Sequence, residues 1–247
     1  MTAEPATLIG GDVDIGSRIA SLDWTRIRAE LEEFGCARTG PVLTPQECGG
    51  LFAAYDRDAA FRSRVVMARH GYGRGEYRYF AYPLPPIVAS LRSALYPRLA
   101  PIANHWARLL GEEDSYPADL APFLERSHGA GQSRPTPLIL KYGPGDYNRL
   151  HQDLYGALAF PLQATFLLSR PGTDFDGGEL VLTEHSPRRQ SRAEVVPLTQ
   201  GEGVVFAVNQ RPVRGARGYR RVAMRHGVSR LRAGRRYTLG IIFHDAA

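Results

Sequence analysis

Short apolar stretches separated by glycine and proline fill the second half of this 247-residue chain. After residues 129–132 the helical spacing of apolar residues gives way to eight such stretches, each long enough for one strand. Eight short strands at this spacing favour a β-sandwich or barrel, here a double-stranded β-helix (jelly roll, cupin-like). The expected strands are Pro137–Tyr142, Leu150–Tyr155, Gln163–Ser169, Glu179–Thr183, Ala193–Pro197, Gly203–Val208, Val222–Val228 and Arg236–Phe243.

The first half of the chain has helix signals instead. A helix is expected from Asp23, its N-cap, to Gly35, where glycine ends it. Thr44 and Glu47 form a capping box around a first-turn proline and predict a second helix. A third helix is expected over residues 87–110, interrupted near its two internal prolines.

These patterns predict an α+β protein in three parts. Residues 1–20 are small, polar and without periodicity, so we expect a flexible N-terminal arm. Residues 21–132 are expected to form a mainly helical support region packed on one sheet. Residues 133–247 are expected to form the double-stranded β-helix, with functional side chains at its open mouth.

Composition narrows the class of protein. An apolar content of 43% is enough for a core, and no stretch reaches the apolar length of a membrane span. The N-terminus lacks the basic start and apolar run of a signal peptide, which predicts a cytoplasmic protein without membrane contact. Cys36 and Cys48 lack zinc-type spacing and are expected in helices as buried free thiols.

The chain is basic, with a net charge of +6 and a pI near 9.5. A basic surface would suit a polyanionic partner. Lys141 is the only lysine, however, and a bias towards arginine also follows from GC-rich coding. Ten arginines lie between Arg211 and Arg236, which leaves a solvated basic loop and a phosphate-binding loop both open.

The strongest functional pattern is the tripeptide His151-Gln152-Asp153 with a distant third residue, His226. On an extended strand, residues two apart point the same way, so His151 and Asp153 are expected to grip one ion. His226 is expected to reach the same ion from a later strand. Two imidazoles and one carboxylate on one face of a metal leave positions open for a cosubstrate and dioxygen, as in non-haem Fe(II) oxygenases.

Ten residues after His226, the strand beginning at Arg236 makes the pattern resemble the Fe(II)- and 2-oxoglutarate-dependent dioxygenases. In that superfamily an arginine at this distance binds the far carboxylate of 2-oxoglutarate, and the resemblance assigns this role to Arg236. Leu140-Lys141-Tyr142-Gly143-Pro144-Gly145 resembles a segment of the AlkB-type nucleic-acid demethylases, in which a tyrosine and an asparagine contact 2-oxoglutarate. Tyr142 matches the tyrosine, whereas Leu140 occupies the asparagine position.

A second resemblance runs through both halves of the chain. The segments 75–80, 135–137 and 151–156 resemble a bacterial oxygenase family described as oxidative demethylases of damaged DNA bases. The chemistry implied is Fe(II)-dependent use of 2-oxoglutarate and O2, with release of succinate and CO2 and hydroxylation of a C–H bond. The segment Phe175-Asp176-Gly177-Gly178-Glu179-Leu180 resembles prolyl hydroxylases instead, and Gly177 and Gly178 also suit a plain turn.

Candidate substrate contacts lie in two basic, aromatic stretches. The glycine-rich stretch 209–221 could close over the mouth, with Arg214, Arg217 and Tyr219 binding phosphate or stacking on a base. Its alternative is an exposed loop. Arg78, in the stretch 74–80, is a further candidate, although an amphipathic strand explains that stretch as well. His244 is not needed as a ligand and is expected to face solvent or to pack at a strand terminus.

Three functional hypotheses follow. The first is demethylation of N-methylated DNA or RNA bases, with nucleic acid as the partner. The second is hydroxylation of a small molecule or a peptide side chain. The third is a binding module that kept the fold without chemistry, which the complete set of His151, Asp153, His226 and Arg236 opposes.

Overall fold

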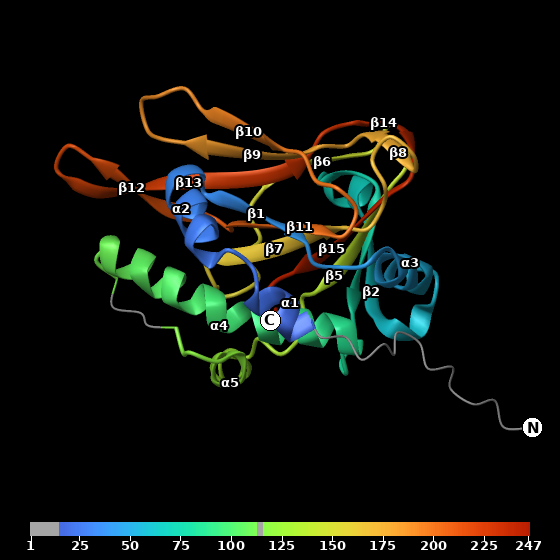
Figure 1. Ribbon diagram of the computed structural model, residues 1–247, viewed down its shortest axis with the longest axis horizontal. Helices are drawn as coiled ribbons and strands as arrows, with labels where there is room; N and C mark the ends of the chain where they lie inside the picture. Colours follow the sequence, from blue (N-terminus) through green and yellow to red (C-terminus); the bar gives the residue numbers. More distant parts are fainter. Residues whose placement is uncertain (1–14, 113–115) are drawn as a thin grey trace, which may run out of the picture.

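The computed structural model describes residues 15–112 and 116–247. Its architecture is a double-stranded β-helix in which a seven-stranded and a six-stranded sheet lie face to face (Figure 1). The seven-stranded sheet has the order β1-β11-β7-β15-β5-β4-β2, and the six-stranded sheet is β10-β9-β13-β6-β3 with β12 paired to β13. This arrangement confirms the predicted α+β jelly roll.

The strands form antiparallel pairs throughout both sheets. A small third sheet pairs β14 with β8. The strands are β1 (Cys36–Pro41), β2 (Phe61–Val66), β3 (Gly73–Arg74), β4 (Glu76–Phe80), β5 (Leu138–Tyr142), β6 (Tyr147–His151), β7 (Leu162–Leu167), β8 (Phe175–Gly177), β9 (Leu180–His185), β10 (Arg192–Val196), β11 (Glu202–Ala207), β12 (Gln210–Gly215), β13 (Gly218–Val228), β14 (Leu231–Gly234) and β15 (Arg236–Ile241).

Helices cover the seven-stranded sheet on the side away from the six-stranded one (Figure 1). The helices are α1 (Ile15–Ala20), α2 (Trp24–Phe34), α3 (Pro45–Ala54), α4 (Pro86–Leu109) and α5 (Leu120–Gly129), with short 3-10 turns η1 (Asp58–Ala60) and η2 (Met67–His70). The central strands β7, β11 and β15 are buried along their whole length. The core therefore continues from the space between the sheets to the layer under the helices.

The predicted helix caps are confirmed. Asp23 accepts a hydrogen bond from the backbone of Arg26, and Gly35 ends α2 in the left-handed conformation. Thr44 and Glu47 form both hydrogen bonds of the capping box that starts α3. None of the helices in the described ranges combines the length and the apolar character that a membrane crossing requires.

Several expectations about the first half of the chain are wrong. The flexible arm expected over residues 1–20 does not include residues 15–20, which form α1 with Ile15 and Ile19 buried; its other residues, 1–14, lie outside the described part of the chain. Helix α4 runs without interruption through Pro97 and Pro101. Both prolines are exposed. The carbonyls that they leave without a helical hydrogen bond therefore lie on the solvent side of the helix, where water can bind them. Cys36 lies in β1 instead of a helix; both cysteines are free and buried, as predicted, and burial raises the pKa of Cys36 to about 11.

The predicted helical support region also supplies strands. Residues 36–80 contain β1, β2, β3 and β4. Strand β1 pairs with β11 and strand β4 with β5, so residues before 133 extend the seven-stranded sheet at both edges. Strand β4 lies in the stretch 74–80, for which the sequence allowed an amphipathic strand. The apolar residues of β1 and β2 follow no clear alternation, so the sequence does not separate these two strands from loops.

Candidate active site

The two histidines of the predicted site are direct cross-strand partners. His151 ends β6 and His226 lies in β13, and the register pairs them with ring centroids 4.2 Å apart. Gly227 makes this close pairing possible, because a Cβ there would lie 2.7 Å from the backbone oxygen of Asn148. The glycine after His226 thus fixes how near β6 and β13 approach each other.

Asp153 joins the two histidines from beyond the end of the strand. The expected strand Leu150–Tyr155 is wrong in its bounds, because β6 ends at His151 and residues 152–155 have no regular structure. The Gln152 amide donates to the carbonyls of Asn209 and Met224, at 2.9 and 2.8 Å, and anchors this turn. The turn, not a period-two strand, places the carboxylate.

Together His151, Asp153 and His226 offer three ligand atoms that lie within 4.8 Å of one another. His151 Nδ1 lies 2.7 Å from the carbonyl of Arg149, which fixes its proton on Nδ1 and leaves Nε2 free for a metal. Two nitrogens and one oxygen on one side of an ion match the donor set of a non-haem Fe(II) site. The residues present therefore fit the metal that the sequence predicts.

Both carboxylate oxygens of Asp153 are held by neutral donors. The Tyr155 hydroxyl donates to Oδ1 at 2.7 Å, and the Gln163 amide donates to Oδ2 at 2.9 Å. Gln163 lies on β7 of the opposite sheet, so it reaches the carboxylate across the space between the sheets. The sequence did not identify either residue as part of the site, because a lone glutamine or tyrosine carries no spacing signal.

The electrostatics of this group favour a charged carboxylate. Burial alone would raise the pKa of Asp153, but the neighbouring His226 and His151 outweigh it and hold the pKa well below the ordinary value. Burial lowers the pKa of His226, against the opposing charge of Asp153. Burial also acts to lower the pKa of His151, but the Asp153 carboxylate outweighs it and raises that pKa. The site thus favours an anionic Asp153 and a neutral His226, and a metal ion would have to displace the proton that Asp153 stabilises on His151.

A second polar group lies deeper in the same cavity. Arg236 on β15 and Tyr142 on β5 occupy paired register positions, and the guanidinium lies 5.7 Å from the Tyr142 ring. Both residues are buried, and neither Arg236 Nη1 nor the Tyr142 hydroxyl has a hydrogen-bond partner among the described residues. Burial lowers the pKa of Arg236 to about 10, so the group stays charged at neutral pH.

Unpaired buried donors of this kind fit a bound carboxylate. A guanidinium offers a planar fork that matches a carboxylate with two hydrogen bonds, and a phenol adds a third. Phe175 of β8 packs 5.9 Å from the same guanidinium, which brings the predicted glycine turn of residues 175–180 next to Arg236. Arg235, its neighbour in sequence, is exposed and does not line the cavity.

One cavity of about 490 Å³ contains both groups. This volume falls in the usual range of small-molecule sites, and most of the lining is apolar or aromatic. Among the described residues that line it, Asp153 is the only acidic one. Tyr77 of the aromatic stretch 74–80 and Thr238, which alternation places on the same face as Arg236, both line the cavity. Lining residues that the sequence did not single out include Tyr72, Asn148, Arg149, Gln163 and Phe206.

The predicted substrate contacts lie outside this cavity. Residues 209–221 form most of the β12–β13 hairpin instead of a loop. Arg214 pairs with Tyr219 near its tip, next to Arg217, and Tyr219 is seven strand residues or roughly 23 Å from His226. The lid expectation is therefore wrong in its geometry, since β12 pairs with the end of β13 that is remote from His226 and the hairpin continues the sheet there (Figure 1).

Arg78 likewise faces away from the cavity. Its guanidinium bonds Asp58 Oδ1 at 2.6 Å and lies 5.0 Å from the centre of the Tyr55 ring. The neighbours Tyr77 and Tyr79 point to the other side of β4, and Tyr77 lines the cavity. An amphipathic strand, the alternative interpretation of this stretch, describes what the structure shows.

The amino-acid sequence matches a known family and a relative of similar length. Residues 75–246 match a family described as "Oxygenase, catalysing oxidative methylation of damaged DNA". A protein of Mycobacterium tuberculosis strain H37Rv, recorded as uncharacterized, is 51% identical over 194 residues, which cover 76% of this chain and 83% of that protein.

Two solved oxygenase structures share this fold. A Pseudomonas putida prolyl-4-hydroxylase has a TM-score of 0.54 at 16% identity, covering 88% of this chain and 96% of its own. A 2OG-Fe(II) oxygenase from Burkholderia pseudomallei has a TM-score of 0.51 at 18% identity, covering 91% and 93%. The chain therefore belongs to the oxygenase family matched over residues 75–246, and it shares its fold with these two oxygenases.

Proposed function

We propose that this dioxygenase removes N-methyl groups oxidatively from nucleic-acid bases. The observation that carries the proposal is the match of residues 75–246 to a family described as acting on damaged DNA. The cavity supports it, because a flat, largely apolar ring suits a lining of Tyr72, Tyr77, Leu154 and Phe206 beside the candidate metal ligands.

Several polar residues of the cavity have a role in this proposed reaction. His151, Asp153 and His226 would hold Fe(II), which supplies activation of O2 coupled to conversion of 2-oxoglutarate into succinate and CO2. Arg236 would bind the far carboxylate of 2-oxoglutarate and Tyr142 would donate a hydrogen bond to it. Tyr155 and Gln163 would keep the Asp153 carboxylate oriented, and the closely packed sheets would exclude water.

The outcome depends on the carbon presented to this site. Hydroxylation of an N-methyl carbon gives an N-hydroxymethyl group, which breaks its C–N bond, releases formaldehyde and leaves the N–H amine. Demethylation is thus the form that oxidation takes when the substrate is an N-methylated base. A base inside a duplex would have to leave the stack, since the cavity admits one ring and not a helix.

The test is a coupled product assay. The iron-loaded protein is incubated with 2-oxoglutarate and a single-stranded oligonucleotide carrying N-methylated bases, with Asp153→Ala as the matched inactive control. We expect formaldehyde and succinate in equal amounts from the wild type and neither from the control. Succinate without formaldehyde is uncoupled turnover and does not decide. Hydroxylation of a small molecule or peptide side chain in a cosubstrate-driven screen, with no formaldehyde from the oligonucleotide, would refute base demethylation in favour of the second hypothesis.

A further inference from the structure

The mouth of the cavity has its own set of residues, which we term the entrance rim: residues 69–74, together with Arg149, Leu150 and Leu154. Gly71 and Tyr72 line the cavity from the first segment, and Arg149, Leu150 and Leu154 line it from β6 and the turn after it. Tyr72, Leu150 and Leu154 are 50%, 45% and 47% exposed. Large apolar and aromatic side chains at a cavity mouth indicate a surface that a ligand covers.

Cations without partners lie among these apolar groups. Arg69, Arg74 and Arg149 are exposed, and none forms an ion pair or a side-chain hydrogen bond within the described parts of the chain. Other exposed arginines do pair with acids, as Arg221 does with Glu112 and Arg232 with Asp176. The rim therefore presents net positive charge that the protein itself does not neutralise.

Close backbone contact holds the rim in place. The register pairs Gly73 with Asn148 and Arg74 with Tyr147, and the amide of Arg149 donates to the carbonyl of Tyr72 at 2.8 Å. Gly73 has a φ of +140°, and a Cβ there would lie 2.3 Å from the backbone oxygen of Tyr147. Segment 69–74 is thus fixed to the strand that ends in His151, one of the candidate ligands.

The aromatic groups of the rim are arranged for stacking. The rings of His70 and Tyr72 lie 5.3 Å apart at 21°, so each supports the other in a nearly parallel orientation. A base that stacks on such a ring gains affinity whatever its identity, because every base has a π-face. Alternating aromatic and cationic groups are what a strand of bases and phosphates needs.

We infer that the entrance rim binds an unpaired strand of nucleic acid, with Arg69, Arg74 and Arg149 on the phosphates and Tyr72 stacked on a base beside the one in the cavity. This inference rests on the proposed function and adds its binding surface. A neutral small molecule would leave the three arginines unused, and a paired base would not expose the face that Tyr72 needs. Hence the rim selects single strands over duplex.

Binding can be measured without turnover. A fluorescein-labelled, unmodified single-stranded DNA is titrated anaerobically with the Fe(II)- and 2-oxoglutarate-loaded protein, and anisotropy gives Kd at several salt concentrations. We expect the triple variant Arg69→Gln/Arg74→Gln/Arg149→Gln to bind at least about 10-fold more weakly. Its slope of log affinity against log salt should fall by about 2, because each phosphate that an arginine no longer neutralises removes about 0.7 from the slope.

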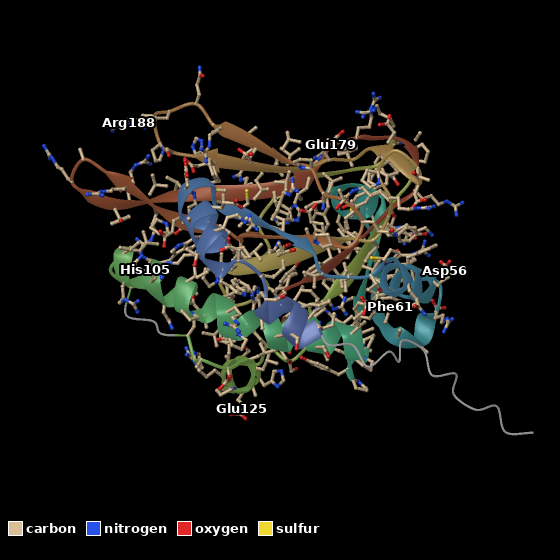
Figure 2. The ribbon with its side chains drawn as sticks, viewed as in Figure 1. Asp56, Phe61, His105, Glu125, Glu179 and Arg188 are labelled. Atoms are coloured by element: carbon tan, nitrogen blue, oxygen red, sulfur yellow. The ribbon has the colours of Figure 1, made fainter. Side chains whose placement is uncertain are left out.

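A charge-matched triple variant separates a binding surface from net charge. Arg57→Gln/Arg98→Gln/Arg188→Gln removes the same charge from exposed arginines elsewhere; Arg188 lies at the outer end of the β9–β10 loop (Figure 2). We expect its Kd to stay within about 2-fold of the wild type, in keeping with a screened long-range effect. Equal weakening in both triple variants would overturn the inference.

Stacking is tested at Tyr72. We expect Tyr72→Ala to weaken single-strand binding by about 5- to 100-fold, and Tyr72→Phe to restore it, because stacking needs the ring and not the hydroxyl. Duplex DNA of the same sequence should bind more weakly and respond less to Tyr72→Ala. Unchanged single-strand binding in Tyr72→Ala, with normal thermal melting, would overturn the stacking role.

Failure of the surface and failure of the proposed function give different results. If the wild type releases formaldehyde from a methylated oligonucleotide and the rim variant does so with the same KM, the function stands and the inferred surface is wrong. If single-strand binding depends on the rim but no methylated oligonucleotide yields formaldehyde, the surface stands and base demethylation is wrong.

Discussion

A buried guanidinium with an unpaired Nη1 is the residue-level feature that best fits a cosubstrate. Arg236 is 3% exposed, and its neighbours are rings instead of acids. A buried charge without a protein partner is costly unless a ligand neutralises it. In the proposed function, the far carboxylate of 2-oxoglutarate would supply the missing charge.

The role of Arg236 can be tested by substitution. We expect Arg236→Ala to raise the KM for 2-oxoglutarate by about 10- to 100-fold, the loss of a charge-assisted hydrogen bond pair. The KM of Arg236→Lys should lie between those of the wild type and Arg236→Ala, because lysine keeps the positive charge but lacks the paired donors of the guanidinium. The exposed neighbour gives the control: Arg235→Ala should leave the KM for 2-oxoglutarate unchanged. An equal rise of KM in that variant would mean that the effect comes from disturbing the start of β15 and not from the Arg236 guanidinium.

His244 is a second buried residue with a measurable consequence. Its ring packs 5.8 Å from that of Tyr155, its Nδ1 accepts a hydrogen bond from Phe160, and its Nε2 is unpaired among the described residues. Burial lowers the pKa of His244 from 6.5 to about 4. His244 lies three residues after β15 ends at Ile241, and its ring is fully buried, so the alternative that it faces solvent is wrong.

The sign of the pH effect follows from this lowered pKa. Between pH 6.5 and about 4 the unfolded chain binds a proton that folded His244 does not, so stability falls as pH falls, by up to about 3 kcal/mol. His244→Asn keeps an acceptor near the Nδ1 position and does not titrate, so we expect a flatter decline. Urea unfolding of the metal-free proteins at pH 7 and 4.5 measures the difference; parallel declines would contradict it.

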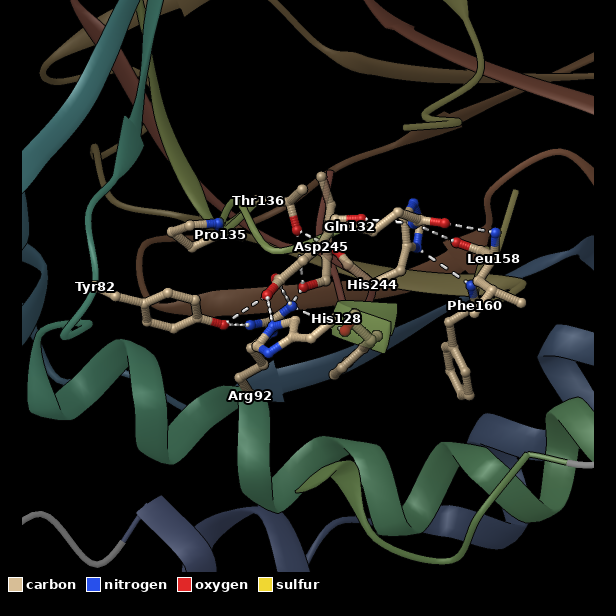
Figure 3. A network of polar contacts seen from close by, with 12 residues as sticks. Tyr82, Arg92, His128, Gln132, Pro135, Thr136, Leu158, Phe160, His244 and Asp245 are labelled. Atoms are coloured by element: carbon tan, nitrogen blue, oxygen red, sulfur yellow. Dashed lines mark hydrogen bonds and ion pairs between the residues drawn. The ribbon is translucent and has the colours of Figure 1, made fainter. Parts of the chain in front are cut away.

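At the scale of elements, one buried carboxylate joins the last strand to the helices. Asp245 follows β15 and accepts hydrogen bonds from the Arg92 guanidinium of α4 and the Tyr82 hydroxyl, and His128 of α5 lies 2.8 Å from its Oδ2 (Figure 3). Arg92 also donates to the carbonyls of Ile242 and Phe243. The network fixes the helical layer to the sheet that carries Arg236.

Breaking this network should be costly. We expect Arg92→Ala to lower the free energy of unfolding by about 3–5 kcal/mol, because it leaves Asp245 buried and charged without its partner. The control is Arg28→Ala, which removes an exposed pair with Glu32 on α2 and should cost about 0.5 kcal/mol or less. Denaturant unfolding by circular dichroism measures both, and similar losses would contradict a dominant role for Asp245.

Elements also show how far the sequence could be interpreted. Strands β7, β11 and β15 could be predicted because most of their residues are apolar and glycine or proline separates them from their neighbours, and alternation favours Arg236 over Arg235 as the inward residue. The hairpin β12–β13 could not be told from a loop, because its glycines and arginines resemble loop composition. The entrance rim has no sequence signal either, since its contact with β6 depends on how near Gly73 approaches a strand over 70 residues away.

For the whole molecule, a metal that joins two strands and a turn should stabilise the fold. A metal ion present at 100 times its Kd raises the free energy of unfolding by about 2.7 kcal/mol. For a protein of this size, each added kcal/mol of stability raises Tm by roughly 2–4 °C. We therefore expect a chelator to lower the Tm of the wild type by several degrees and to leave His151→Ala unchanged. An equal effect on both proteins would mean that these residues do not hold the ion.

The depth at which Arg236 lies has a kinetic consequence. The guanidinium is buried, whereas Arg149, Leu150 and Leu154 stand at the mouth of the same cavity. A macromolecule seated on that mouth would obstruct diffusion of a dicarboxylate to the interior. The dicarboxylate should then have to bind before the macromolecule. Initial-rate measurements should accordingly show the pattern of an ordered mechanism, with the dicarboxylate as the first reactant.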